Sequence, residues 1–246
     1  MAGHSHAHNI MFKKGANDAK KAKIFTKLAR DISIAAKSGT NPDLNPKLKI
    51  LVAKARTLNM PKDKIATAIE KANKDTTNYE NVRYNAVFDR GISFIIEGLT
   101  DNKNRTSSDI RGILNKFNAQ LVSTGSVEFA YSHIGRIIYS EDVCDENKMF
   151  EVALNAGAND VYKEEGENED DKGVYIIETD IENMLNVVAD ITKELNKEPQ
   201  TAEWFWKAND YISNIEDKDF IDKYQRLFDA LDDLDDITDV YTNADL

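Results

Sequence analysis

The first strongly periodic segment runs from about residue 17 to residue 37, and its apolar residues recur at the spacing of an α-helix. At about 100° per residue, six of them fall within an arc of about 120°, and four basic residues fall within an arc of about 80° on the opposite side. The pattern predicts a helix with an apolar face and a basic face. The apolar residues are Phe25, Leu28, Ala29, Ile32, Ala35 and Ala36, and the basic ones are Lys20, Lys23, Lys27 and Arg30.

Two shorter helices are predicted to follow. Asn45 and Pro46 combine an N-cap residue with a first-turn proline, and a further helix begins at Pro61. Three short helices with short connections are typical of a small bundle. The apolar stripes that support it are Leu48, Leu51, Val52, Ala55 and Leu58 in the second helix and Ile65, Ile69 and Ala72 in the third.

Beyond residue 80 the pattern changes to alternating strands and helices. Thr106 and Asp109 resemble a capping box, and a strand at Ser126–Tyr131 would complete a βαβ unit that begins with a strand at Gly91–Leu99. The remaining predicted strands cover residues 136–140, 160–163, 174–179, 202–206 and 237–241, and the remaining predicted helices cover residues 146–156, 181–195 and 218–231.

This order of elements predicts a multidomain α+β protein. We expect a basic three-helix domain over residues 1–78 and a discontinuous α+β domain made of residues 79–134 and 200–246. An acidic α+β domain over residues 135–199 would be inserted into it. Both α+β domains are expected to be small and ferredoxin-like.

Charge is strongly segregated along the 246 residues. Residues 1–75 hold 16 Lys and Arg against 6 Asp and Glu, a net charge of +10, whereas the remainder holds 16 against 37, a net charge of −21. Such asymmetry indicates a basic module that meets a polyanion. The overall charge of −11 conceals it.

The densest basic cluster lies at the N-terminus, where a phosphate backbone is the expected partner. Lysine is a point charge suited to phosphate oxygens, and such contacts provide affinity without reading base sequence. The competing interpretation is an ordinary solvated helix face, although such faces usually mix both signs of charge. The candidate contacts are Lys13, Lys14, Lys20, Lys21, Lys23, Lys27 and Arg30.

A second basic element surrounds the start of the helix expected after residue 100. Lys103 and Arg105, with Asn104 and Arg111 nearby, lie where helix N–H groups favour anions. The alternative is a solvated loop leading into a capped helix. Both interpretations remain open at this level.

Other chemistry finds little support in the sequence. No phosphate-binding loop, nucleophile elbow, metalloprotease pair or dinucleotide fingerprint occurs, so we expect no catalytic residues, no cofactor and no structural metal site. Cys144 is the only cysteine, and no apolar run reaches the length of a membrane span, which together favour the cytoplasm. We interpret His4, His6 and His8 as an adventitious metal-binding tail, and Trp204 and Trp206 as packing residues.

Short blocks along nearly the whole chain resemble the YebC/PmpR family. They are Met1–Ser5, Lys14–Ala16, Asp18–Lys20, Lys23–Leu28, Asn45–Pro46, Asn59–Lys62, Leu99–Asn102, Asn104–Thr106, Gly125–Val127, Asp239–Tyr241 and Asn243–Asp245. The family is usually described as bacterial DNA-binding transcriptional regulators, related to the mitochondrial translational activator of cytochrome c oxidase. The resemblance implies a helical domain followed by two α+β domains, one of them inserted in the other.

Three functional hypotheses follow from the residues and the resemblance. The leading one is a DNA-binding transcriptional regulator that contacts the phosphate backbone through its basic helical domain. The alternative is a translation factor that binds ribosomal RNA with the same residues, because helical lysines do not distinguish duplex DNA from structured RNA. In the third, the acidic C-terminal domains bind a protein partner.

Overall fold

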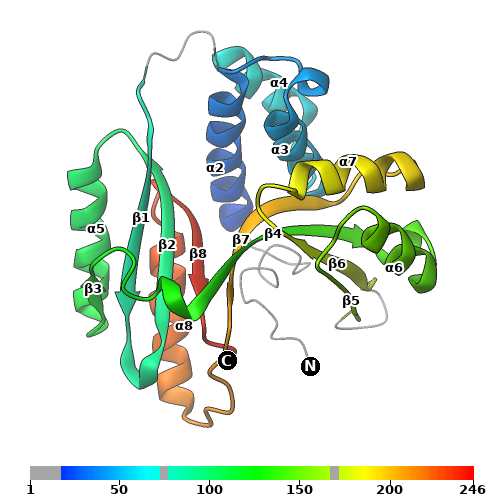
Figure 1. Cartoon of the computed structure of the whole chain (residues 1–246). Helices are drawn as coiled ribbons and strands as arrows, with labels where there is room; N and C mark the ends of the chain where they lie inside the picture. Colours follow the sequence, from blue (N-terminus) through cyan, green and yellow to red (C-terminus); the bar gives the residue numbers. More distant parts are fainter. Residues whose placement is uncertain (1–17, 73–76, 167–171) are drawn as a thin grey trace. The chain divides into compact units, whose positions relative to one another are not determined.

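The computed structural model describes residues 18–72, 77–166 and 172–246, with side chains described from residue 21 onward (Figure 1). It divides into two compact units. Unit 1 combines Met1–Lys27, Thr76–Ser132 and Trp206–Leu246, and unit 2 combines Leu28–Asp75 and His133–Phe205. Three elements contribute residues to both units, namely α2 (Asp18–Ala36), β4 (Tyr131–Ser140) and β7 (Thr201–Ala208).

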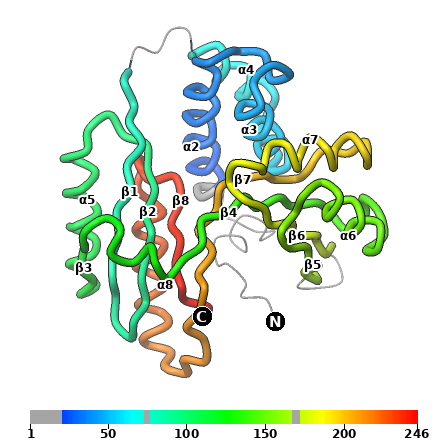
Figure 2. The backbone as a smooth tube through the Cα atoms, in the orientation of Figure 1, coloured from blue at the N-terminus to red at the C-terminus, as the bar shows by residue number. Residues whose placement is uncertain are grey.

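Unit 1 is built on a four-stranded sheet in the order β3-β1-β2-β8. Neighbouring strands are antiparallel, and β8 pairs with β2, so the end of the chain returns to the sheet that begins this unit (Figure 2). The last helix and the last strand of the chain therefore belong to the sheet and core of this unit. The elements are β1 (Glu80–Val87), β2 (Ser93–Thr100), α5 (Lys103–Lys116), β3 (Gln120–Val122), α8 (Lys218–Asp232) and β8 (Ile237–Thr242).

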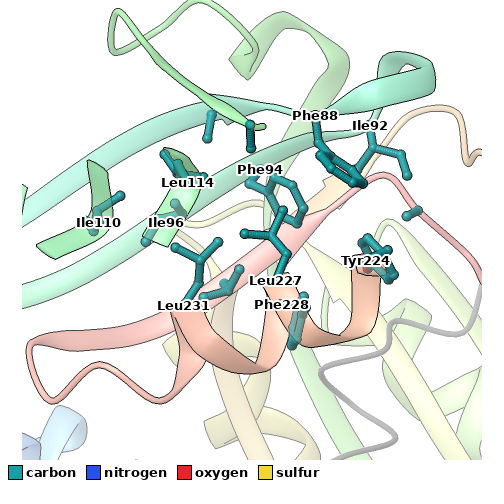
Figure 3. Close-up of a cluster of buried hydrophobic side chains, with 14 of the residues drawn as sticks. Phe88, Ile92, Phe94, Ile96, Ile110, Leu114, Tyr224, Leu227, Phe228 and Leu231 are labelled. Atoms are coloured by element: carbon teal, nitrogen blue, oxygen red, sulfur yellow. The ribbon is translucent and has the colours of Figure 1, made fainter. Parts of the chain in front are cut away.

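Helices α5 and α8 pack on one face of this sheet and form the core of unit 1 with it (Figure 3). Phe94 and Ile96 alternate along β2 toward the helices, which supply residues at helical spacing. Phe94 stacks on Tyr224 with ring centroids 6.1 Å apart. The helix residues in the core are Ile110 and Leu114 of α5 and Phe220, Tyr224, Leu227, Phe228 and Leu231 of α8.

Three expectations for this unit were wrong. Helix α5 begins at Lys103, a turn before the expected capping box, because the side-chain oxygen of Asn102 accepts a hydrogen bond from the Arg105 N–H at 3.1 Å. The expected strand at residues 126–131 is a turn and a short 3₁₀ helix, Glu128–Ala130, before β4. Its alternation of apolar residues was misleading, since Phe129 is 84 % exposed. The strand that follows α5 is β3, which pairs antiparallel with β1, so the expected βαβ unit does not form. Strand β1 was not predicted, because half of its residues are polar.

Unit 2 contains a second antiparallel arrangement, in the order β5-β6-β4-β7. Helices α6 and α7 pack on it around a core that includes Ile137, Tyr139 and Ile177. Helix α3 also belongs to this unit, and the Asn45 side chain accepts a hydrogen bond from the Leu48 N–H at 3.1 Å, which confirms the predicted N-cap. The bounds are α3 (Pro46–Thr57), α4 (Lys62–Lys71), α6 (Glu146–Asn155), β5 (Asp160–Glu164), β6 (Val174–Thr179) and α7 (Met184–Leu195).

The multidomain α+β class is confirmed, and the three-part division of the chain remains a prediction. Strand β7 belongs to the sheet of β4, β5 and β6, although its residues were assigned to the discontinuous domain.

A buried ionic cluster connects α3 to this second sheet within unit 2. Glu203 accepts from Lys54 Nζ at 3.0 Å and from Arg136 at 2.5 Å, and the side chains of Lys54, Arg136 and Glu203 are 16 %, 7 % and 16 % exposed. The Arg136 guanidinium also lies 3.5 Å from the ring centroid of Phe205. Burial alone would raise the pKa of Glu203, but the two cations outweigh it and lower the pKa to about 2.

We predict that Glu203→Gln destabilises the protein, because it leaves two buried cations without a counter-charge. Breaking a buried ion pair costs about 3 kcal/mol, measurable by urea unfolding at pH 7. Since the pKa of Glu203 is depressed, its contribution is complete above its ordinary value of 4.5 and disappears as the pH falls toward 2. The deficit should shrink over that range.

Glu198→Gln is the matched control. Glu198 pairs with Lys49 at 2.8 Å, but both side chains are about half exposed, so the loss should stay below about 0.5 kcal/mol. Equal losses in the two variants would contradict the role of burial.

Candidate nucleic-acid interface

The basic residues of the N-terminal cluster differ in their surroundings in the structure. Lys13 and Lys14 lie outside the described residues, as does the side chain of Lys20, although its backbone belongs to α2. Lys21 is exposed, and Arg30 lies half-buried in the part of α2 that belongs to unit 2. The remaining two, Lys23 and Lys27, contact another element of unit 1.

Lys23 and Lys27 bind the C-terminal end of α8. Lys23 Nζ lies 2.8 Å from Asp233 Oδ1, and Lys27 Nζ lies 3.4 Å from Asp232 Oδ1 while it also donates to the Asp232 carbonyl oxygen. The Lys27 side chain is only 14 % exposed, whereas that of Lys23 is 47 % exposed. The basic face of α2 is therefore not a solvated face along its whole length.

The end of α8 has a physical reason to attract these ammonium groups. A helix C-terminus carries partial negative charge from its unpaired carbonyl groups, and cations near it are stabilising. The last turn of α8 contains no basic residue, and Asp232 and Asp233 add two carboxylates at this end. Lys23 and Lys27 supply the positive charge that the last turn of α8 lacks.

The second predicted basic element contacts the same segment through Arg105. Arg105 Nη2 lies 2.6 Å from Asp236 Oδ2 and 2.9 Å from Asp101 Oδ1. Thr106 and Thr100 donate their hydroxyl groups to Asp236 Oδ2 at 2.7 Å and 3.1 Å. Although burial alone would raise the pKa of Asp236, these donors outweigh it, so its pKa lies below the ordinary value.

The backbone fits this arrangement closely. The Leu99 N–H donates to the Asp236 carbonyl oxygen at 2.8 Å, and a Cβ at Gly98 would lie 2.6 Å from that oxygen. Only glycine allows the strand to approach so closely. Lys103, by contrast, pairs with Glu80 at 2.5 Å, at the start of β1.

The structure thus brings together three of the predicted residues on one acidic segment. We define the acidic turn as Asp232–Asp236, which joins α8 to β8 and contains four aspartates. Lys23, Lys27 and Arg105 all contact it. Sequence reasoning missed the turn, although its run of aspartates is visible in the printed sequence. Their partners lie more than 100 positions away in the chain.

Several other basic side chains are exposed and make no ion pair with any residue in the described part of the chain. They lie on helices α2 to α5. They are Lys21, Arg56, Lys62, Lys71, Arg111 and Lys116.

The remaining sequence candidates show structural roles. Trp206 is 7 % exposed, donates its indole N–H to Glu97 Oε1 at 3.1 Å and lies under the Arg83 guanidinium at 4.6 Å. Burial and Asp145 raise the pKa of the Cys144 thiol, which disfavours the reactive thiolate. Among the described helices, none combines the length and apolarity that crossing a membrane requires.

We predict that Asp236→Ala lowers the free energy of unfolding by about 2 kcal/mol, because it removes a partly buried charged acceptor from Thr100, Thr106 and Arg105. Asp101→Ala removes only an exposed pair with Arg105 at i,i+4 and should cost less than about 0.5 kcal/mol. Chemical unfolding of both variants would measure the difference. A smaller loss for Asp236→Ala than for Asp101→Ala would contradict this role of Asp236.

Comparison with known proteins finds relatives that align along the full chain. A probable transcriptional regulatory protein of Rickettsia bellii is 39 % identical over 249 residues, covering 100 % of this chain and 94 % of its own length. One from Zymomonas mobilis is 40 % identical over 248 residues, covering 100 % and 96 %. The crystal structure of a conserved hypothetical protein, Aq1575, from Aquifex aeolicus matches with a TM-score of 0.75 and 30 % identity, covering 92 % of this chain and 91 % of that chain.

The family descriptions cover both parts of the sequence. Residues 5–75 match the TACO1/YebC protein N-terminal domain, and residues 79–244 match the TACO1/YebC second and third domain. Together with full-length relatives near 39 % identity, these matches show that the chain belongs to the TACO1/YebC family.

Proposed function

We propose that this protein regulates gene expression by binding the phosphate backbone of DNA through its basic N-terminal helices. The observation that carries the proposal is the separation of charge, +10 in residues 1–75 against −21 in the remainder. A segment with a net positive charge attracts a polyanion, and the acidic remainder repels it, which would restrict contact to one part of the protein.

Exposed side chains on the helices support this proposal. Lys21 on α2, Arg56 on α3, and Lys62 and Lys71 on α4 extend into solvent. Flexible lysines of this kind neutralise phosphates without reading bases, because each one supplies a mobile point charge. The relatives' names as transcriptional regulatory proteins favour DNA as the target.

We predict that replacing Lys13, Lys14 and Lys21 together by Ala weakens binding to a labelled 20-base-pair duplex. The slope of log K against log salt should become shallower by about 0.9 for each lysine that contacts a phosphate. Fluorescence anisotropy at several salt concentrations measures both quantities. These three positions leave the contacts of Lys23 and Lys27 with α8 intact.

The matched control replaces Lys193, Lys197 and Lys218 by Ala, which removes the same charge from exposed positions outside the basic segment. Its salt slope should equal that of the unmodified protein. If both triple variants lose affinity equally, net charge governs binding and the proposed surface is wrong.

The nature of the nucleic acid requires a separate measurement. Lysines on a helix contact duplex DNA and structured RNA in the same way. Competition between the duplex and an RNA hairpin of equal charge, followed by recovery of the protein on ribosomes or on chromosomal DNA from a lysate, separates the two targets. Preferential recovery on ribosomes would replace the transcriptional proposal with a role in translation.

A further inference from the structure

The acidic turn presents to three basic side chains the kind of oxygen atoms that a nucleic acid would present. Lys23 and Lys27 contact the carboxylates of Asp233 and Asp232, and Lys27 also contacts a helix-terminal carbonyl oxygen. At the other end of the turn's sequence, Arg105 contacts the carboxylate of Asp236. Lysine and arginine bind carboxylate and phosphate oxygens with the same charge-assisted hydrogen bonds.

The contacts of the acidic turn with Lys23 and Lys27 restrict the binding of phosphate to these two side chains. Lys27 is 86 % covered, so a phosphate cannot reach its ammonium group while the contact with Asp232 persists. Lys23 lies one helical turn earlier and is engaged by the neighbouring carboxylate. Two of the lysines that the sequence assigns to phosphate binding are therefore already held within unit 1.

We infer that the acidic turn Asp232–Asp236 is an internal competitor that occupies Lys23 and Lys27 and must be displaced before a nucleic acid can use them. The inference rests on the proposed function. The turn then inhibits binding of nucleic acid to Lys23 and Lys27. A polyanion that binds weakly contacts only the basic side chains that are exposed. A nucleic acid that makes enough contacts with those exposed side chains displaces the turn and gains contacts with Lys23 and Lys27.

The strength of the contact suits such a role. The Lys23–Asp233 pair has side chains 47 % and 52 % exposed, and exposed pairs contribute little, typically less than about 1 kcal/mol. Arg105 is bound more extensively, since Asp236 also receives two threonine hydroxyl groups. The Asp232 and Asp233 side can therefore open while Asp236 keeps the turn attached to β2 and α5.

The test is the double substitution Asp232→Asn and Asp233→Asn. It should increase affinity for the labelled 20-base-pair duplex by about three- to tenfold, because two competing carboxylates lose their charge. The variant should fold, because negative charges near a helix C-terminus interact unfavourably with the helix dipole and the substitutions remove two of them. Circular dichroism before the binding measurement verifies this.

The control is the double substitution Asp222→Asn and Asp235→Asn. It makes the same change in net charge, on α8 and within the turn itself, at exposed aspartates that pair with no described cation. Its affinity should stay within about twofold of the unmodified protein. Equal gains in both double variants, or no gain from Asp232→Asn and Asp233→Asn, would overturn the inference.

A second readout separates this inference from the proposed function. Limited acylation of lysines followed by mass spectrometry should find Lys27 protected in the unmodified protein and more reactive in the Asp232→Asn, Asp233→Asn variant. Unchanged reactivity would overturn the inference even if DNA binds. If reactivity rises but none of the proteins binds DNA or RNA, the proposed function fails, and the inhibitory role of the contact fails with it.

Discussion

The carboxylate of Asp236 joins parts of unit 1 that lie far apart in the sequence. Its Oδ2 atom accepts hydrogen bonds from Thr100 at the end of β2 and from Arg105 and Thr106 in the first turn of α5. Arg105 lies 131 positions from Asp236 in the sequence. Because these donors share one partly buried acceptor, the pairing of β8 with β2 and the start of α5 are held in a single arrangement. The acidic turn depends on this anchor, and so does the site that the turn offers to α2.

The ionic contacts of Glu203 and of Asp233 differ in burial and therefore in what they contribute. Glu203 is almost enclosed with Lys54 and Arg136, so removing the charge of one of them leaves the others as poorly solvated charges, at a cost in stability. Asp233 and Lys23 face water, where solvent screens the pair and either partner can leave at little cost. The first cluster stabilises unit 2, whereas the second has the weakness expected of a contact that exchanges partners.

Charge segregation acquires a more specific meaning in this structure. The acidic and basic parts are not only separate in the sequence, because one turn of the acidic part binds Lys23 and Lys27 of the basic helix directly. A polyanion approaching α2 encounters both exposed cations and an intramolecular substitute for phosphate. Specificity can arise from this competition as well as from the direct contacts.

The sequence by itself determined the elements whose periodicity is strong. Helices α2, α3, α6 and α8 follow from apolar residues at helical spacing, and strand β6 follows from a short continuous apolar run, because local burial preference depends only on nearby residues. Charge segregation was also legible, since it requires only the order of the residues. The α+β class followed from the same patterns.

Only the tertiary structure decided which charges are paired. Lys27 meets Asp232 across 205 positions, and Lys54 meets Glu203 across 149, and no local pattern specifies partners at such distances. Strand β1 was hidden for a related reason. Its Asn85 is fully buried and accepts a hydrogen bond from the Gly125 N–H at 2.5 Å. In the sequence such a polar residue suggests a loop, because its hydrogen-bond partner is close to it only after the chain has folded.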